Sequence, residues 1–387
     1  MDFKELHKLF SKKETDLGKL QKEENFSRYI LIRTLGKEHI CEILNNNSIE
    51  PSSNDYNELY EQLFNTEVDN QEIISYIKNK YPEIRQQRHE EEAHLPEIIR
   101  NFGIVSCGIR NDNLNEESKR LVRDKSIASV EELNNAIDDL LQNKVKGYLL
   151  WEYYNQATND LIEHLFNDND NIIPTLRKIT YVDFLMEING EIVPFDLKIT
   201  HISDEYFNCL SSGLIEDSGN DSYRIGSSLN ELKQIKDYYG SIKRAFDLPN
   251  YGGLKKSEIV EVLKSKHINT IDEKLNEFYA KRLEMVNSLE QNKKSIEWWN
   301  YKFQGERLFK NNNRFYIFLV YDDSFDDARP LKGKIELITD KVNTELNKLK
   351  NGEYNVIKYY YDKDPSVRGE YEIVSTSVLI SSHCECC

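Results

Sequence analysis

Apolar residues recur at spacings of three and four through the first 145 residues, which is the pattern of helices that pack one face against a core. Glycine and proline are sparse there, so few breaks between helices are expected. The sequence therefore predicts a helical N-terminal region over residues 1–145, with residues 102–110 as a strand that interrupts it. The expected helices cover residues 5–13, 24–44, 55–64, 70–81 and 129–144.

The pattern changes after a further expected helix at residues 151–166. Residues 181–200 alternate apolar and polar positions, which predicts strands, and strand character returns at residues 314–323. Between them, residues of about 203–310 form a Lys-rich segment with helical spacings. The order predicts a mixed α/β fold, with a core sheet flanked by helices over residues 146–387 and a helical insertion. The remaining expected elements are a helix at residues 332–350 and strands at residues 354–362 and 371–380.

Composition limits the class of protein. The chain is 39% hydrophobic and 30% charged, with no apolar run of about eighteen residues and no apolar signal segment at its start, so we expect a cytoplasmic protein without membrane contact. A formal net charge of −16 argues against a protein that binds nucleic acid by being basic overall, but it allows local basic patches and carboxylates that hold metal. Gly-rich phosphate loops are absent from the sequence, so no nucleotide cofactor is expected.

The dipeptide Asn189-Gly190 lies between two alternating runs and predicts a two-residue hairpin turn, because such turns need positive φ at both positions. This turn places Ile188 opposite Glu191 and, by extension, Asp183 opposite Asp196. Lys198 lies two residues beyond Asp196 and shares its face. The other face is apolar, with these residues: Val182, Phe184, Met186, Ile188, Val193, Phe195, Leu197 and Ile199.

Directly opposed carboxylates destabilise a hairpin, and a divalent cation between them would relieve the repulsion. Hard oxygen ligands suit Mg²⁺, whose bound water can be oriented and deprotonated. Lys198 could then position that water or stabilise negative charge on a phosphate. The alternative is an ordinary Asp–Lys ion pair on a solvated face, which is common in proteins.

These residues resemble the PD-(D/E)xK nuclease superfamily, in which an Asp on one strand is followed after a turn by an acidic residue, any residue and a Lys. Here these positions are Asp183 and Asp196-Leu197-Lys198, and Val182 stands where the family motif has proline. The continuation FDLKITHIS most resembles type II restriction endonucleases, which often carry a hydroxyl residue two positions after the Lys, as Thr200 does. The resemblance covers about 50 residues closely and extends loosely to residues 314–323 as a later core strand.

The resemblance also implies a further acidic metal ligand from the helix before the hairpin. Glu152, Gln156, Asn159 and Glu163 lie on one face of that helix. Glu152 is the first choice because it is acidic and early in the helix, and Glu163 is the alternative. All four could instead be the solvated face of a surface helix.

The resemblance therefore implies a Mg²⁺-dependent endodeoxyribonuclease acting on double-stranded DNA, with Asp183, Asp196 and Glu152 as metal ligands and Lys198 as a catalytic residue. A type II restriction enzyme of this kind would be a homodimer whose two-fold axis matches its site, and the helical N-terminal region, residues 1–145, is then a candidate for dimerisation or DNA clamping. The alternatives are a nonspecific or activated nuclease of a defence or repair system, and a noncatalytic DNA-binding protein that keeps the fold.

Two basic parts of the chain are candidates for DNA contact. The first is residues 222–228 (SYRIGSS), a loop suited to groove contacts. The second is the insertion, whose positive side chains could offset phosphate charge: Lys233, Lys236, Lys243, Arg244, Lys255, Lys256, Lys264 and Lys266. The C-terminal residues 383–387 (HCECC) favour a tail over a structural zinc site, because such sites draw ligand pairs from separated segments.

Overall fold

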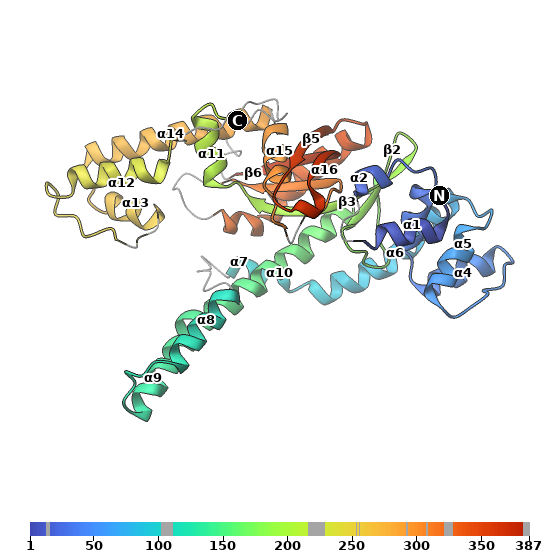
Figure 1. Ribbon diagram of the computed structural model, residues 1–387, viewed down its shortest axis with the longest axis horizontal. Helices are drawn as coiled ribbons and strands as arrows, with labels where there is room; N and C mark the ends of the chain where they lie inside the picture. Colours follow the sequence, from blue (N-terminus) through green and yellow to red (C-terminus); the bar gives the residue numbers. More distant parts are fainter. Residues whose placement is uncertain are drawn as a thin grey trace.

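The computed structural model is a mixed α/β protein, which confirms the fold class expected from the sequence. A central sheet carries a helical lobe at each end, and a long helical arm projects from it (Figure 1). The expectations for residues 102–110, 222–228 and 383–387 lie outside the residues that the structure describes. The structure describes residues 1–12, 16–101, 111–215, 229–252, 254, 256–291, 293–306, 309–320 and 328–381.

Six described strands form one sheet in the order β1-β2-β3-β4-β6-β5. The neighbours β3, β4 and β6 run parallel, whereas β1, β2 and β3 pair antiparallel, as do β5 and β6. Strands β3 and β4 are therefore adjacent although the whole insertion separates them in the chain. The strands are β1 Ile172–Ile173, β2 Phe184–Ile188, β3 Glu191–His201, β4 Arg314–Leu319, β5 Asn355–Tyr361 and β6 Gly369–Ile380.

The hairpin of β2 and β3 has the predicted register. Asn189 and Gly190 have φ values of 54° and 83°, as a type I′ turn requires. Ile188 pairs with Glu191, and the pairing continues to Phe184 opposite Phe195, whose rings stack at 5.3 Å. The apolar face is confirmed for these strand residues, but Val182 precedes β2 and packs into the N-terminal core instead.

Helices cover both faces of the sheet, so its central strand is apolar on both sides. On one face, Phe315 and Ile317 of β4 pack with α10 (Lys146–Asn167) and α16 (Ile335–Lys350). On the other face, Tyr316 and Phe318 pack with α15 (Lys294–Lys302). Two short 3-10 helices complete this part of the chain, at Arg329–Gly333 and Pro365–Val367.

The N-terminal helices pack against one another and against the hairpin, because Leu185 and Ile192 belong to their core. The expected helix at residues 24–44 is divided near Gly36, and α6 continues to Glu92, through Pro82. These helices are α1 Phe3–Phe10, α2 Leu17–Leu20, α3 Phe26–Arg33, α4 Lys37–Asn46, α5 Tyr56–Phe64 and α6 Asn70–Glu92.

The arm consists of α8 (Asn111–Val122), α9 (Val130–Leu140) and the first turns of α10, with α7 (Leu95–Asn101) against α10 at its base (Figure 1). A π-helical segment, Leu141–Val145, joins α9 to α10 without a break. The domain boundary expected at residue 145 therefore falls inside a continuous helical run. The arm and the sheet share one long helix, which ends beside β1.

The insertion forms the lobe at the opposite end of the sheet from α1–α6 (Figure 1). Its helices enclose a small core of their own around Ile235, Tyr239 and Ile259. Arg282 forms ion pairs with Glu231 and Asp204, and Lys256 pairs with the same two carboxylates, each at 3.0 Å. The Lys256 ammonium is thus paired inside the insertion, so we do not expect it to contact a DNA phosphate. The insertion helices are α11 Asp204–Ser211, α12 Glu231–Ile242, α13 Lys256–Lys264 and α14 Asn269–Gln291.

None of the described helices is both long enough and apolar enough to cross a membrane.

Candidate active site

Asp196 and Lys198 lie in the middle of β3 and point to the same face of the sheet. Asp196 is 4% exposed, whereas the Lys198 side chain is 46% exposed. The Lys198 Nζ lies 3.0 Å from Asp196 Oδ1 and 2.9 Å from Oδ2. A nearly buried carboxylate is thus held by an ammonium that remains open to solvent.

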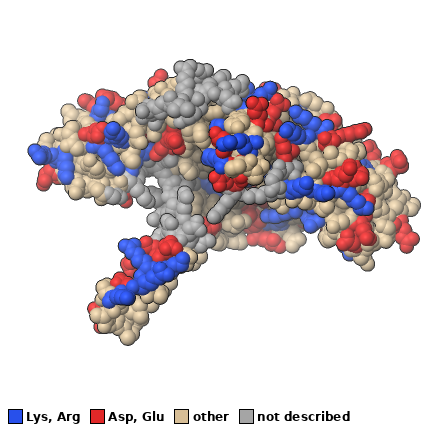
Figure 2. Space-filling model, in the orientation of Figure 1, with Lys and Arg blue, Asp and Glu red and all other residues tan. Residues whose placement is uncertain are grey.

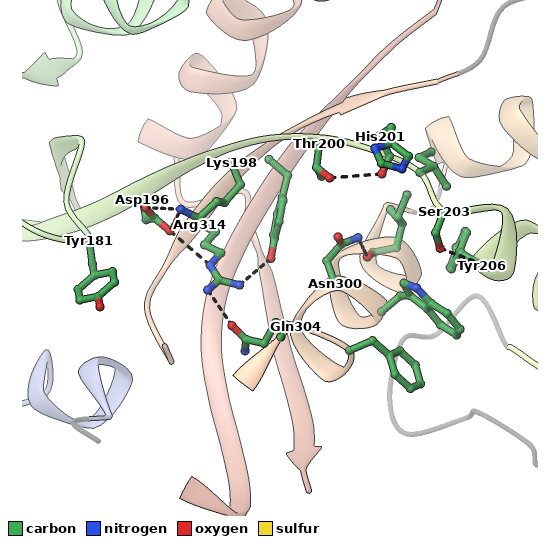
Figure 3. A pocket seen from close by; sticks show the side chains of 16 residues that line it. Tyr181, Asp196, Lys198, Thr200, His201, Ser203, Tyr206, Asn300, Gln304 and Arg314 are labelled. Atoms are coloured by element: carbon green, nitrogen blue, oxygen red, sulfur yellow. Dashed lines mark hydrogen bonds and ion pairs between the residues drawn. The ribbon is translucent and has the colours of Figure 1, made fainter. Parts of the chain in front are cut away.

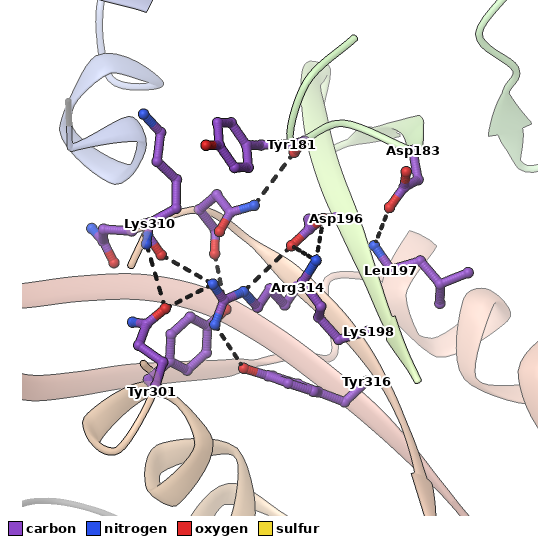
Figure 4. A network of polar contacts seen from close by, with 12 residues as sticks. Tyr181, Asp183, Asp196, Leu197, Lys198, Tyr301, Lys310, Arg314 and Tyr316 are labelled. Carbon is purple, nitrogen blue, oxygen red and sulfur yellow. Dashed lines mark hydrogen bonds and ion pairs between the residues drawn. The ribbon is translucent and has the colours of Figure 1, made fainter. Parts of the chain in front are cut away.

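Arg314 begins β4 and is paired directly with Asp196 across the parallel strands. Its Nε lies 3.5 Å from Asp196 Oδ2, and its other nitrogens donate to Gln304 Oε1 at 2.8 Å and Tyr316 Oη at 3.2 Å (Figure 4). Burial opposes its charge, but Tyr316, Tyr301 and Asp196 raise the pKa of Arg314 above its ordinary value. Arg314 therefore stays charged and holds Asp196 from inside the sheet.

Asp183 lies one residue before β2 and beyond the last strand pair, Phe184–Phe195, so the predicted ladder pair of Asp183 with Asp196 is not formed. Its backbone N–H donates to Phe195 O at 2.8 Å, and its Oδ2 accepts from the Leu197 N–H at 2.6 Å (Figure 4). The pKa of the Asp183 carboxyl is raised from 3.8 to about 6, chiefly by burial and then by the charge of Asp196. The hydrogen bond from Leu197 and the charge of Lys198 oppose this shift only in part.

The structure also decides which helix carboxylate lies near this pair. Glu163 on α10 is close enough to contribute to the raised pKa of Asp183, and burial raises the pKa of Glu163 itself. Its nearest cation is Lys178, whose Nζ is 4.0 Å from Glu163 Oε2. Glu152 is exposed on the arm side of the same helix, about 16 Å from Glu163 along the axis at 1.5 Å per residue. Glu163, not Glu152, joins the electrostatic neighbourhood of Asp183 and Asp196.

This placement predicts a difference between two matched variants. Glu163→Gln should weaken the binding of a divalent cation roughly 10- to 100-fold, the range seen when a supporting ligand of a metal site is removed. Glu152→Gln should leave it unchanged. Calorimetric titration of each full-length variant with Mn²⁺ measures the difference, and equal affinities for the two variants would place the helix-borne ligand elsewhere.

The carboxylates fit a hard cation by their chemistry but are not yet arranged around one. Among the described residues, no three His, Cys, Asp or Glu side chains are gathered closely enough to hold a metal ion. Asp196 is engaged by Lys198 and Arg314, although its buried Oδ2 accepts no hydrogen bond from the described residues. A cation between Asp183 and Asp196 would relieve their repulsion, and Lys198 would have to release Asp196 to admit it.

A cavity of about 470 Å³ opens beside Asp196 and Lys198. It extends from these residues along the end of β3 to the segment of α15 and Phe303, where Trp299, Asn300 and Phe303 line it. Figure 3 shows Asn300 on this side of the cavity, away from Asp196. Arg314, Gln304 and Tyr316 form part of its lining as well. Asp183 lies outside the cavity, on the opposite side of β3 from Arg314 (Figure 4).

Sequence reasoning did not select Arg314, Gln304 or Tyr316. The one available signal was an arginine at the start of the apolar run RFYIFLV, where a charge inside a central strand requires a partner.

No protein-family model matches the chain, and no match was found among curated proteins or solved structures.

Proposed function

We propose that this protein is a Mg²⁺-dependent endodeoxyribonuclease that hydrolyses phosphodiester bonds of double-stranded DNA. The observation that supports this most is the repulsion between two neighbouring carboxylates, Asp183 and Asp196, with Lys198 bound to Asp196 at the mouth of a cavity. Strongly perturbed carboxyls cluster at functional sites. The sequence order of these residues is also that of the PD-(D/E)xK motif.

Each residue has a role that its position allows. Asp183 and Asp196 would bind the cation, and Glu163 would complete the acidic group from α10. Bound Mg²⁺ would polarise the phosphate and lower the pKa of a coordinated water. Lys198, half exposed and already beside Asp196, would orient that water or stabilise charge on the phosphate. Arg314 would contact neither the water nor the phosphate, and its role would be to position Asp196.

The substrate would meet a protein surface of mixed charge. On the side that Figure 2 shows, Lys and Arg are interspersed with Asp and Glu over both lobes. Several lysines of the insertion remain candidates for contact with the DNA backbone, among them Lys233, Lys264 and Lys266. Sequence-specific cleavage, as in a type II restriction enzyme, is our first choice. A nonspecific or activated nuclease and a noncatalytic DNA-binding protein are the other possibilities.

A homodimer would form through the arm. Helix α9 buries none of its residues. Leu133 and Ile137 of α9 and Leu141 of the adjoining π-helical segment are 38%, 37% and 47% exposed along one face. Glu131 and Glu132 stand near one end of this stripe, and Lys144 and Lys146 near the other. An antiparallel second copy would therefore cover the apolar stripe and bring opposite charges together.

The corresponding prediction is that Ile137→Glu converts a dimer to a monomer, because two glutamates would face each other in the apolar stripe across the two-fold axis. Asn135→Glu, on the polar face of the same helix, is the matched control and should remain dimeric. Light scattering coupled to size-exclusion chromatography measures the mass of each variant. A wild-type chain that is monomeric at all concentrations, or an Ile137→Glu dimer, would contradict this interface.

The proposed activity is tested with a long, unmodified DNA of known sequence, incubated with and without Mg²⁺, beside the variant Lys198→Ala. Discrete fragments that need Mg²⁺ and disappear in the variant would support a site-specific nuclease, whereas a smear lost in the variant would support a nonspecific one. DNA that stays intact under every condition but binds tightly without Mg²⁺ would favour the noncatalytic alternative.

A further inference from the structure

The cavity beside Lys198 has a wall that hydrolysis of phosphodiester bonds does not require. Trp299 and Phe303 of the α15 segment lie with their ring centroids 4.1 Å apart, and Tyr206 packs against Trp299 at 5.6 Å. All three residues line the cavity, and Figure 3 shows Tyr206 at the end away from Asp196. Tyr206 is fully buried and Trp299 is 7% exposed, so the half-buried Phe303 is the most open of the three rings. The cavity thus joins a charged end to an aromatic end.

The volume of about 470 Å³ lies in the range of pockets that enclose one small ligand. A duplex cannot enter such a space, because its bases are stacked inside the sugar-phosphate backbone. One base with its sugar can enter when it leaves the stack, and aromatic side chains then replace its stacking neighbours.

Polar groups between the two ends suit the edge of a base. The Asn300 Nδ2 donates to Ile296 O at 2.9 Å, and its Oδ1 accepts no hydrogen bond from the described residues. Thr200 lines the same cavity from β3. At the charged end, the Lys198 ammonium is the group that would contact a phosphate. The cavity therefore offers a cation for the phosphate, polar groups for the edge of the base and aromatic side chains for its face.

We infer that this cavity receives one unpaired nucleobase, extruded from the strand whose phosphate lies at Lys198. The inference rests on the proposed function for the identity of the substrate, and it adds that the DNA is distorted beside the cut. An unpaired nucleotide spares the cost of extrusion, so DNA that already contains one should bind more tightly than a perfect duplex.

The test uses the full-length wild-type chain in EDTA and three labelled DNA duplexes of equal length, whose affinities are measured by fluorescence anisotropy. The first is fully paired, the second has one bulged nucleotide, and the third has an abasic residue at the bulge. The base-containing bulge should bind roughly 5- to 150-fold more tightly than the abasic bulge, the range for one stacked base. The comparison separates stacking of the base from the flexibility that any bulge gives to DNA.

Two variants locate the effect. Asn300→Trp fills the cavity and should abolish the difference between the base-containing and abasic bulges. Asn57→Trp, exposed on α5, should retain it. Equal affinity for the two bulges in the wild type, or no binding of any of the three duplexes, would overturn the inference, and neither outcome depends on a variant that folds.

Failure of this inference and failure of the proposed function are distinguishable. If wild-type protein cuts paired DNA with Mg²⁺ but does not discriminate the bulges, the activity stands and the base-binding pocket is wrong. If it discriminates the bulges but never cuts DNA, the pocket stands and the nuclease is wrong.

Discussion

Asp183→Asn is expected to make the protein more stable at pH 8 while reducing Mg²⁺-dependent cleavage about a thousandfold. The folded state raises the pKa of this carboxyl from 3.8 to about 6, chiefly through burial and then through Asp196. An acid with a raised pKa holds its proton more tightly in the folded than in the unfolded chain, so ionisation costs stability. At pH 8 that cost is ~3 kcal/mol at 1.36 kcal/mol per unit. It diminishes as the pH falls through 6 and vanishes near pH 4.

Asparagine keeps an oxygen for the Leu197 N–H and removes the charge, so it should recover about 1–3 kcal/mol at pH 8 and nothing near pH 4. Under the proposed function, the loss of a metal ligand would account for the reduced cleavage. A thousandfold lower rate corresponds to ~4 kcal/mol of transition-state stabilisation.

Urea unfolding at pH 8 and at pH 4, together with DNA cleavage at pH 8, measures both effects. Asp170→Asn is the matched control, because Asp170 is exposed and should change neither quantity. A variant less stable than wild type at pH 8 would show that the carboxylate is not under repulsion. A stabilised variant with full cleavage would show that Asp183 is not a ligand.

The opposite effects on stability and activity are the expected result for a site that holds two carboxylates together in readiness for a cation. The unliganded fold carries the free-energy cost of ionising Asp183 beside Asp196, and a bound cation would offset that cost. Because the proton and the cation compete for Asp183, Mg²⁺ binding should weaken as the pH falls below about 6.

The local geometry of the hairpin was predictable from the sequence, because it depends on few residues. Asn189-Gly190 determines the turn, and the turn determines the register of the pairs from Ile188–Glu191 to Phe184–Phe195. Asp183 lies beyond the last of these pairs, so its position depends on more than the turn. The apolar spacing of the flanking strands agrees with that register. The pairing therefore needs no information from distant parts of the chain.

The choice between Glu152 and Glu163 could not be made in this way. The two residues are eleven apart, close to three full helical turns, so they share a face of α10 and differ only in their position along its axis. That position depends on where α10 crosses the sheet, which is a tertiary property. Helical periodicity therefore identified the face of α10 that carries both glutamates, but not which of the two lies beside the sheet.

Arg314 illustrates a second limit. It faces Asp196 because β4 pairs in parallel with β3 after the whole insertion has intervened, and parallel pairing has no local turn to fix its register. The sequence shows an isolated arginine at the start of an apolar strand. Its partner becomes evident only from the strand order.

Arg314→Met is expected to cost about 3–5 kcal/mol of unfolding free energy, the range for breaking one side of a buried ion pair. Arg314 is 5% exposed, and its removal leaves Asp196 with Lys198 alone and Gln304 without its charged donor. The double variant Asp196→Asn/Arg314→Met should lose less stability than the sum of the single variants, because it leaves no uncompensated charge from this pair. Chemical unfolding without Mg²⁺ measures the three values, and strict additivity would mean that the pair is not coupled.

The same variant tests whether Asp196 binds a cation. Arg314 and a bound Mg²⁺ would compete for one carboxylate, so Mg²⁺ should stabilise Arg314→Met more than the wild type through linkage of binding to folding. Arg282→Met is the matched control. Arg282 is a 3% exposed arginine paired with Glu231 and Asp204 in the insertion, so its loss should destabilise the fold without changing the response to Mg²⁺. An equal response in both variants would remove Asp196 from the metal site, because Arg314 holds that carboxylate and Arg282 does not.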